Sequence, residues 1–405
     1  HYRCTGSLQV YWVITGVLPS LVAKYGYPIE THTVITDDGY ILTLHRIPHG
    51  RHKTTEERSR NKIVSRVPVL MQHGLLASSA CWILAPVDKA PAYVMANAGY
   101  DVWLGNARGN FYSRAHTHLS PDEKEFWDFS WDEMAAHDVP AVIDYILAHT
   151  SHPSLYYIGH SMGTTMFFAS MATRPEYHSK VRMMFGLGPV ATVAHVRSPI
   201  RFIAPFADNA QLLGKYEFLP HSPRFVRWTE ALCTLHKFEE IMCRNAFFFL
   251  TGFDAPQFNM TWLPVILGHT PAGTSTRTVI HFAQEINSGQ CKFLHYDFGR
   301  KENQKRYHQP TPPVYTLSHV KVPVVLIWGQ NDYLADPQDV ARLASELPQL
   351  KASFKVELPL FNHIDFLWGI DADKYVYRII CNDLEEDYTG LKSSYSRVKV
   401  IVLKG

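Results

Sequence analysis

The sequence has almost no excess charge of either sign. Among its 405 residues, 39 Lys and Arg stand against 37 Asp and Glu, so the formal net charge at pH 7 is only +2. Such a chain has no strong field with which to hold phosphate groups, and we expect no nucleic-acid partner. Internal repeats and low-complexity blocks are also lacking. With 46% hydrophobic residues, the chain can bury one large core.

We expect no integral membrane span. The apolar run from Leu8 to Val22 is about fifteen residues long, which is short for a bilayer, and it contains Pro19. A remnant of a signal segment, a membrane anchor and a helix on the body are the three interpretations, and a helix or an irregular terminal segment is favoured. The chain starts at His1 instead of Met, so we expect it to be processed or truncated.

Cysteine is scarce and no metal pattern is evident. Six cysteines allow about fifteen full pairings, so their connectivity cannot be read from the sequence. The 22 histidines lack ligand-type spacing apart from pairs such as His116 and His118, and we expect neither a metal ion nor an organic cofactor. A single Asn-x-Thr acceptor, Asn259-Met260-Thr261, predicts a glycan at Asn259 if the protein is secreted.

Short apolar runs alternate with helical patterns along most of the chain. Residues 32–47 read as a hairpin around the turn Asp37-Asp38-Gly39, and the charged stretch 49–66 reads as an exposed loop. Six further runs are bounded like buried strands: 67–71, 100–104, 155–158, 181–187, 322–327 and 354–358. Strands of this kind, alternating with helices, predict an α/β protein with a mostly parallel sheet.

Two stretches are predicted to be helical. Ser130-Trp131-Asp132-Glu133 has the form of a capping box, and Pro140 is expected to kink or restart the helix that follows it. From about residue 189 to 317 strand signals vanish and helical, aromatic-rich segments replace them. We expect this stretch to be a helical insertion over the sheet.

A candidate nucleophile lies between the third run and a helix. In Gly159-His160-Ser161-Met162-Gly163 the glycines permit a sharp strand-to-helix turn, which lifts the serine clear at a helix N-terminus. A G-x-S-x-G match alone is a modest signal, but the strand before it and the helical run after it supply the required context. Ser161 is therefore the predicted nucleophile.

A serine hydroxyl needs a base, and the base needs an orienting acid. Asp332 follows the run 322–327, and His363 follows the next run, in the chain order Ser, acid, His that this kind of site requires. Alone, Asp332 reads as a turn residue and His363 as an ordinary loop histidine; their order and placement favour catalysis. Asp336 and Asp339 are rival acids at the start of a predicted helix, 339–347.

Backbone amides are the expected oxyanion donors. His73-Gly74-Leu75-Leu76 directly follows the first buried run, where one N–H can point at the developing negative oxygen. We assign this role to the amides of Leu75 and Met162. The alternative is an ordinary strand-to-loop glycine at Gly74.

Taken together, the motifs resemble the acid lipase family, which includes gastric lipase and lysosomal acid lipase. The resemblance implies an α/β-hydrolase fold with an inserted helical cap and a movable lid. It implies the same three residues, Ser161, Asp332 and His363, and activity on acylglycerols or sterol esters at a lipid–water interface. The matching stretches run from about residue 24 to 385: 24–28, 37–42, 73–78, 106–110, 132–134, the elbow, 272–275, 334–340 and 362–366.

The resemblance also sets boundaries and a cysteine pairing. It implies a hydrolase core of 24–188 and 318–388, a cap of 189–317, an N-terminal segment 1–23 and a tail 389–405. The family's cap disulfide implies a bond between Cys233 and Cys243, and Cys81 is expected to be a buried thiol. Met162 stands where the family usually carries Gln, a departure that leaves the amide donor intact.

A secreted protein is expected, with the lysosome as the alternative. Two other functions compete with the lipase interpretation: a lipid-binding or storage protein of the same fold without turnover, and an esterase for small soluble esters. Intact candidates for all three catalytic roles argue against the first, and a large apolar cap argues against the second.

Overall fold

The computed structural model describes residues 18–51, 66–206, 215–222, 245 and 247–390. The predicted exposed loop 49–66 and the apolar run 8–22 therefore lie mostly outside the described residues. The end of that run forms a helix, as favoured: α2 spans Leu18–Lys24 and buries Leu18, Leu21 and Val22. Within the described ranges, no helix is long and apolar enough to cross a membrane.

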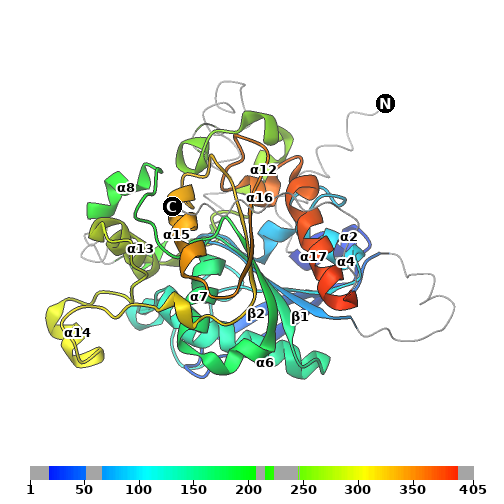
Figure 1. Cartoon of the computed structure of the whole chain (residues 1–405). Helices are drawn as coiled ribbons and strands as arrows, with labels where there is room; N and C mark the ends of the chain where they lie inside the picture. Colours follow the sequence, from blue (N-terminus) through cyan, green and yellow to red (C-terminus); the bar gives the residue numbers. More distant parts are fainter. Residues whose placement is uncertain (1–17, 52–65, 207–214, 223–244, 246, 391–405) are drawn as a thin grey trace.

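A sheet forms the centre of the molecule (Figure 1). It has eight strands in the order β1-β2-β4-β3-β5-β6-β9-β10. The predicted hairpin is confirmed as the antiparallel pair β1 and β2, and β2 joins β4 antiparallel. All other neighbours pair in parallel, as predicted. The strands are β1 Glu30–Ile35, β2 Ile41–Ile47, β3 Pro68–Gln72, β4 Asp101–Leu104, β5 Leu155–His160, β6 Val181–Leu187, β9 Val324–Trp328 and β10 Leu350–Lys355.

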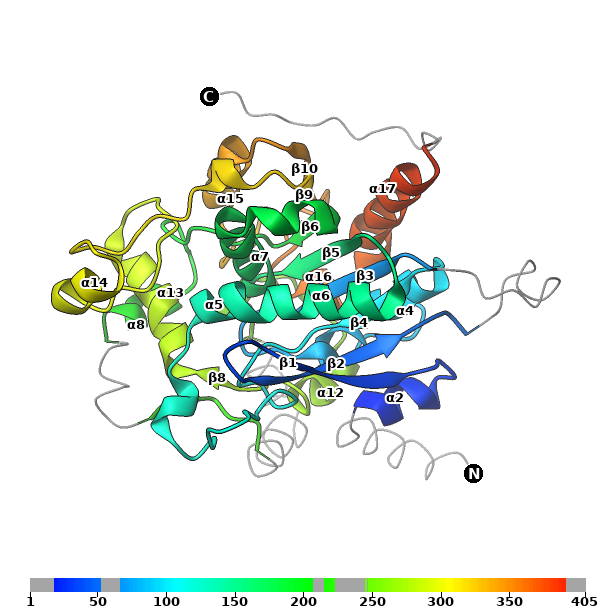
Figure 2. The same ribbon diagram turned by 90° about the horizontal axis from the view of Figure 1, so that it is seen from below.

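Helices cover both faces of this sheet (Figure 2). Because side chains alternate along a strand, Val69 and Met71 enter one core cluster with α2, α4 and α17, while Leu70 enters the other with α6 and α7. The α-helices are α2, α4 Pro91–Asn97, α5 Trp131–Glu133, α6 Val139–Thr150, α7 Met162–Thr173, α8 Ile200–Ile203, α12 Leu263–Leu267, α13 Thr276–Ser288, α14 Arg300–Arg306, α15 Pro337–Glu346, α16 Asp365–Trp368 and α17 Arg378–Thr389.

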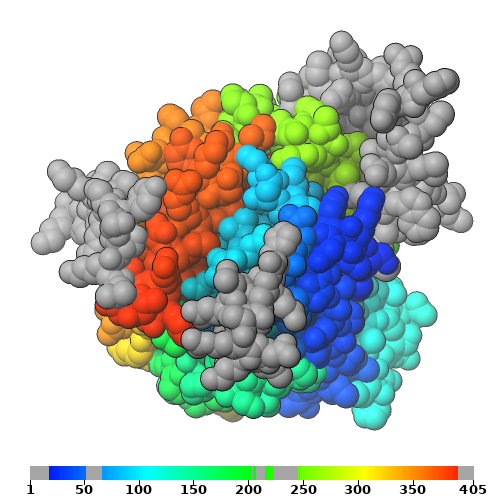
Figure 3. All heavy atoms as spheres, turned by 90° about the vertical axis from the view of Figure 1, so that its right-hand side faces the viewer, coloured from blue at the N-terminus to red at the C-terminus, as the bar shows by residue number. Residues whose placement is uncertain are grey.

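The two ends of the described chain lie on the same face of the molecule (Figure 3). Figure 3 shows the N-terminal residues in blue and α17 in red, with the segment around α4 in cyan between them. Leu18 of α2, Ala92 of α4 and Leu384 of α17 belong to the same buried cluster. Residues that are distant in sequence therefore pack together on this face of the sheet.

The predicted capping box is confirmed, and the helix after it changes its hydrogen-bond pattern just before Pro140. The Ser130 side chain accepts a hydrogen bond from the Asp132 amide, and the Glu133 carboxylate accepts one from the Ser130 amide at 2.6 Å. A π-helical turn, Met134–Asp138, follows, and α6 begins at Val139 with Pro140 in its first turn. The helical backbone is continuous from Trp131 through this turn, and the wider π turn accommodates the proline ring inside it.

The last strand differs from its prediction. Its expected range was 354–358, whereas β10 is Leu350–Lys355 and pairs in parallel with β9. As an edge strand it is only partly buried and carries Lys351, Ser353 and Lys355, so it lacks the apolar signal of a buried strand. The apolar residues after it drew the prediction too far along the chain.

Between β6 and β9 the described chain contains several helices, as expected, but irregular stretches separate them. This stretch includes α8, α12, α13 and α14, and it also forms a two-stranded antiparallel pair, β7 Glu217–Phe218 with β8 Thr274–Ser275. The sequence therefore showed no sign of one short strand pair in this stretch. Two residues per strand are too few to leave a periodic pattern in the sequence.

Candidate active site

Ser161 lies at the sharp turn between β5 and α7. Its backbone has φ 53° and ψ −123°, a strained conformation for a residue with a side chain, and the residue is half-buried. The Ser161 amide donates to the Leu187 carbonyl of β6 at 3.1 Å, and the Ser161 carbonyl accepts from the Thr164 amide at 2.8 Å. The turn thus holds the serine at the carboxyl end of the parallel strands.

Gly163 makes this turn possible by allowing two backbones to approach. A Cβ at Gly163 would lie 2.3 Å from the Gln72 carbonyl oxygen at the end of β3, far inside contact distance. The loop after β3 also lies against the nucleophile, because a Cβ at Gly74 would lie 2.9 Å from the Ser161 Cβ. The glycines of the elbow are therefore required by packing as well as by the turn.

Asp332 and His363 form a buried hydrogen-bonded pair. The imidazole Nδ1–H of His363 donates to Asp332 Oδ2 at 2.8 Å, which leaves Nε2 free of this partner. The other carboxylate oxygen of Asp332 accepts from the amides of Leu334 and Ala335 at 2.9 and 2.8 Å. These bonds fix the carboxylate and thereby the tautomer and orientation of the ring.

The rival acids have other partners. Asp336 caps α15 through the Gln338 amide and forms an ion pair with Arg197. Asp339 accepts from the Thr192 hydroxyl and from the His195 amide and ring. Among the described residues, Asp332 forms a hydrogen bond with His363, and neither Asp336 nor Asp339 does.

The two amides assigned as oxyanion donors flank the nucleophile. Met162 is the first residue of α7, and Leu75 follows Gly74, which lies against Ser161. The first N–H groups of a helix have no partner within it, which applies to Met162, and among the described residues no backbone hydrogen bond outside helices and strands is made by the Leu75 N–H. Both donors are therefore available to a ligand atom beside the serine.

His73 was missed as a supporting residue. Its Nδ1–H donates to the Gly74 carbonyl at 2.8 Å, and its Nε2 accepts from the Ala107 amide at 3.1 Å. Complete burial lowers the pKa of His73 to about 4, so the ring is neutral near pH 7. His73 links the two motifs 73–78 and 106–110 through its hydrogen bond with Ala107, and the presence of both motifs in the sequence could have indicated this role.

His160, inside the elbow motif, was also missed. Its Nε2–H donates to the backbone carbonyl of His363 at 2.9 Å, and the two rings lie 4.8 Å apart. Burial and the neighbouring His363 lower the pKa of His160 to about 3. A neutral His160 therefore joins the strand before Ser161 to the loop of His363.

A segment from the insertion contacts the loops of both Asp332 and His363. The Thr251 carbonyl accepts from the Tyr333 amide at 3.2 Å and from the His363 amide at 3.4 Å. The Gly252 carbonyl accepts from the Asn362 side chain at 2.9 Å. We call residues 251–254 the bridging segment; its only signal in the sequence is one glycine and one aspartate in an apolar stretch.

The remaining predictions concern the cysteines and the glycan acceptor Asn259. Cys233 and Cys243 lie outside the described residues, as does Cys4. Cys81 is a buried free thiol, as expected, and Cys291 and Cys381 are also free. Asn259 is partly exposed, and its side chain accepts hydrogen bonds from Thr261.

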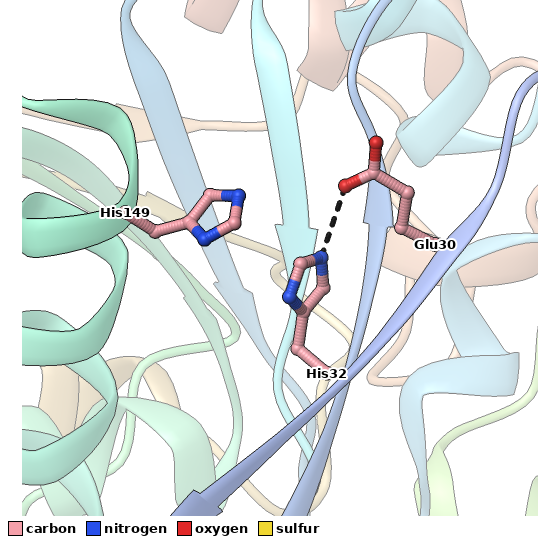
Figure 4. A group of neighbouring side chains, drawn as sticks. All are labelled: Glu30, His32 and His149. Carbon is pink, nitrogen blue, oxygen red and sulfur yellow. Dashed lines mark hydrogen bonds and ion pairs between the residues drawn. The ribbon is translucent and has the colours of Figure 1, made fainter.

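Two groups of side chains in the described ranges could offer three ligand atoms to a metal ion. In one of them, Glu30 and His32 from β1 face His149 from α6 (Figure 4). The guanidinium of Arg46 already donates to Glu30 at 2.9 Å and to His149 at 3.2 Å. The positively charged Arg46 side chain thus lies where a metal ion would have to bind. In the other group, Asp37, Asp38 and His137, both oxygens of Asp38 already accept from the Arg108 guanidinium, at 2.6 and 2.9 Å, and we assign no metal to either group.

Comparison with known proteins is consistent with this geometry. The model of the partial alpha/beta-hydrolase lipase region matches residues 18–85, and that of the alpha/beta hydrolase fold matches residues 67–220. Gastric triacylglycerol lipase of Bos taurus is 41% identical over 370 residues, 91% of this chain and 90% of that protein. Lipase member K of Mus musculus is 40% identical over 377 residues, 91% of each chain. A solved structure from Sulfolobus solfataricus shares the fold, with a TM-score of 0.55 and 12% identity over 88% of this chain and 99% of that one.

Proposed function

The chain belongs to the acid lipase family of the α/β-hydrolase fold, and on that basis we propose that Ser161, His363 and Asp332 carry its hydrolysis of lipid esters. The family resemblance and the fold drawn from the motifs are both confirmed. The observation that carries the assignment of residues is the combination of a strained, half-buried Ser161 with a buried Asp332–His363 hydrogen bond. Ester hydrolysis is the activity that the lipase relatives' names describe.

The reaction is acyl transfer to the serine and then to water. Ser161 Oγ attacks the ester carbonyl while His363 Nε2 takes its proton; the C–O bond to the alcohol then breaks, and His363 protonates the leaving oxygen. Water repeats the sequence on the acyl-enzyme and releases the acid. The amides of Leu75 and Met162 stabilise the negative oxygen, and Asp332 stabilises the imidazolium.

Exposed apolar side chains beside the site support a lipid substrate. Phe249, Leu250 and Phe253 from the insertion and Leu360 from the loop of the base are 56, 45, 45 and 49% exposed. The Asn331 side chain donates to the carbonyls of both Phe253 and Leu360, so these two segments are adjacent. Apolar surface of this kind is typical of a protein that meets a lipid–water interface. We propose triacylglycerols or sterol esters as the substrates.

The remaining sequence-based assignments belong to the same proposal. Residues 189–317 are proposed as the cap over the core of 24–188 and 318–388, closed by a Cys233–Cys243 disulfide. A glycan at Asn259 and secretion are proposed together, because the acceptor is used only in the secretory pathway. The lysosome is the alternative location. No metal or organic cofactor enters the proposed chemistry.

Hydrolysis by the intact protein and by Ser161→Ala tests the proposal. An emulsified long-chain triacylglycerol, a sterol ester and a short soluble ester are assayed from about pH 4 to 8, which brackets the ordinary pKa of histidine. We expect serine-dependent turnover of at least one long-chain lipid ester. Ser170→Ala is the matched control: it removes a buried hydroxyl of the same helix that has no hydrogen-bond partner in the described structure.

Two outcomes would replace the proposal. Turnover of the short ester alone would indicate an esterase for small soluble substrates. No serine-dependent turnover of any ester, in a protein that still binds lipid, would indicate a carrier that kept the fold without the reaction.

A further inference from the structure

Two buried aspartates join the bridging segment to the loop of His363. Asp254 ends the bridging segment, and Asp365 is the first residue of α16; they are 2% and 1% exposed. One oxygen of Asp365, Oδ2, accepts from the Asn362 amide at 2.7 Å. The other, Oδ1, and Oδ2 of Asp254 are buried and receive no hydrogen bond from any other described group.

These two carboxyl groups interact directly with each other. Each of them has one buried oxygen without another partner, and a hydrogen bond between these two acceptors requires that one of them carries a proton. Two ionised carboxylates in this position would repel one another at low dielectric, because their donors, the backbone amides of Asn362 and Gln257, carry no positive charge to offset the repulsion. Burial, and then the neighbouring carboxyl group, raise the pKa of Asp365 well above its usual range, and burial raises the pKa of Asp254.

The other titratable groups around the pair do not replace the missing donor. The Asp332 carboxylate, in the loop after β9, adds negative charge at Asp365. The Tyr377 phenol, from the π-helical turn Asp373–Tyr377, faces Asp365 but donates to the Phe366 carbonyl. His363, two residues before Asp365, is hydrogen-bonded to Asp332. Among the described residues, no ion pair with a Lys, Arg or His is recorded for Asp254 or Asp365.

We propose that Asp254 and Asp365 share one proton, and that this bond holds the bridging segment against the loops of Asp332 and His363. The pair positions the loop of His363 through Thr251 and Gly252. As pH rises, loss of the shared proton lowers kcat. The inference rests on the proposed function in one respect only, namely that His363 is the base. The sharing of the proton is a property of the folded protein whether or not it turns over ester.

The consequence for His363 follows from the contacts of the bridging segment. Repulsion between two ionised carboxylates pushes this segment away from α16. The same segment supplies the carbonyl that accepts from the Tyr333 and His363 amides, and the carbonyl that holds the Asn362 side chain. A displaced base lowers kcat more than it changes KM, because its geometry matters most in the transition state.

Asp254→Asn is the decisive variant. The amide N–H of Asn donates to Asp365 without any shared proton, so the bond persists at all pH values. We expect wild-type kcat at low pH and an alkaline limb of the kcat profile that moves upward by about one pH unit or more. Asp254→Leu removes the bond at every pH, and we expect kcat to fall about tenfold across the profile. Asp371→Asn, which changes a nearby, partly exposed carboxylate held by Lys374, is the control that leaves the profile unchanged.

Unfolding measured in a Ser161→Ala background separates this inference from the proposed function. Because the folded pKa values are raised, the stabilisation is complete below the ordinary Asp pKa of about 3.9 and is lost as pH rises through the folded pKa. Adding Asp254→Asn is expected to remove this loss of stability. The carbonyl stretch of a protonated carboxylic acid in the infrared spectrum should disappear in the same variant.

The results decide between the possibilities. Identical pH dependence of unfolding for Ser161→Ala with and without Asp254→Asn would overturn the shared proton. A shift in unfolding with an unchanged kcat profile would overturn the positioning of His363 and leave a purely structural pair. If Ser161 proves inert toward esters, the unfolding and infrared results still test the proton.

Discussion

The two halves of the candidate site are held in different ways. The nucleophile half, Ser161 with the loop after β3, is fixed by neighbouring strands of the sheet and by close backbone contacts at Gly163. The acid–base half, Asp332 with His363, follows two strands of the same sheet but is also held by the bridging segment from the insertion. The nucleophile half is thus held within the sheet itself, whereas the acid–base half is held partly by the insertion.

This difference indicates where the site can be adjusted. Close packing of strand and helix leaves few alternative positions for Ser161. The acid–base half is joined to the insertion by a small number of hydrogen bonds, each worth about 1 kcal/mol. Changes in the insertion are therefore expected to alter the base before they alter the nucleophile.

The largest effect is expected from Asp332→Asn. The amide cannot hold the reactive tautomer of His363 or stabilise its imidazolium, and we expect kcat to fall about 10⁴-fold, equivalent to about 5.5 kcal/mol in the barrier. Steady-state kinetics on an ester substrate measures it. Asp336→Asn is the matched control, since Asn can still cap α15. A comparable loss in the control would transfer the role of the acid to Asp336.

A smaller effect is expected from Gly252→Ala in the bridging segment. Gly252 has φ +112°, and a Cβ there would lie 2.0 Å from the Asn331 carbonyl oxygen, so the segment must withdraw from the loop of the acid. We expect kcat to fall about 100-fold, with the reaction of Ser161 toward a small, base-independent acylating probe less affected. Gly289→Ala is the control, because Gly289 also has a positive φ but nothing within 4 Å of its Cβ position. Equal losses in both variants would mean that backbone strain alone is responsible.

The sequence predicted the parts of the site whose signals are local. Ser161 and Asp332 lie shortly beyond strands that were recognised, β5 and β9, and His363 lies farther beyond β10, so the order of the parallel strands brings all three to one edge of the sheet. The bridging segment could not be predicted in this way, because Thr251 meets His363 through backbone groups that every residue has. The position of β10 was wrong because a partly exposed edge strand does not need a continuous apolar pattern.

The stability of the two halves is expected to depend on pH with opposite signs. His73 supports the nucleophile half, and because its folded pKa is lowered to about 4, its contribution is present above pH 6.5 and lost as pH falls through about 4. His73→Gln is expected to flatten the acid limb of the unfolding free energy, by on the order of 3 kcal/mol at most. Denaturant titrations between pH 4 and 7 measure this, with the exposed His118→Gln as control. An unchanged acid limb would mean that His73 does not carry it.

The smallest effect is expected at the rim of the acid–base half. Arg197, near the start of the insertion, donates to the carbonyls of Asp332 and Gln330 at 2.7 and 3.1 Å and pairs with Asp336. Its side chain is 40% exposed, so water can replace these contacts at low cost. We expect Arg197→Ala to lower kcat only a few-fold, with the same loss appearing in the wild type at high salt.

Arg201→Ala, in the same part of the insertion, serves as its control, since the recorded contact of that side chain is with Phe202. A loss at Arg197 as large as that of Gly252→Ala would mean that the acid–base half depends on the whole insertion instead of on the bridging segment. A few-fold loss would place most of the coupling in the buried contacts of residues 251–254. These contacts are shielded from water, and no solvent molecule can take the place of the Thr251 carbonyl without opening the loops of both Asp332 and His363.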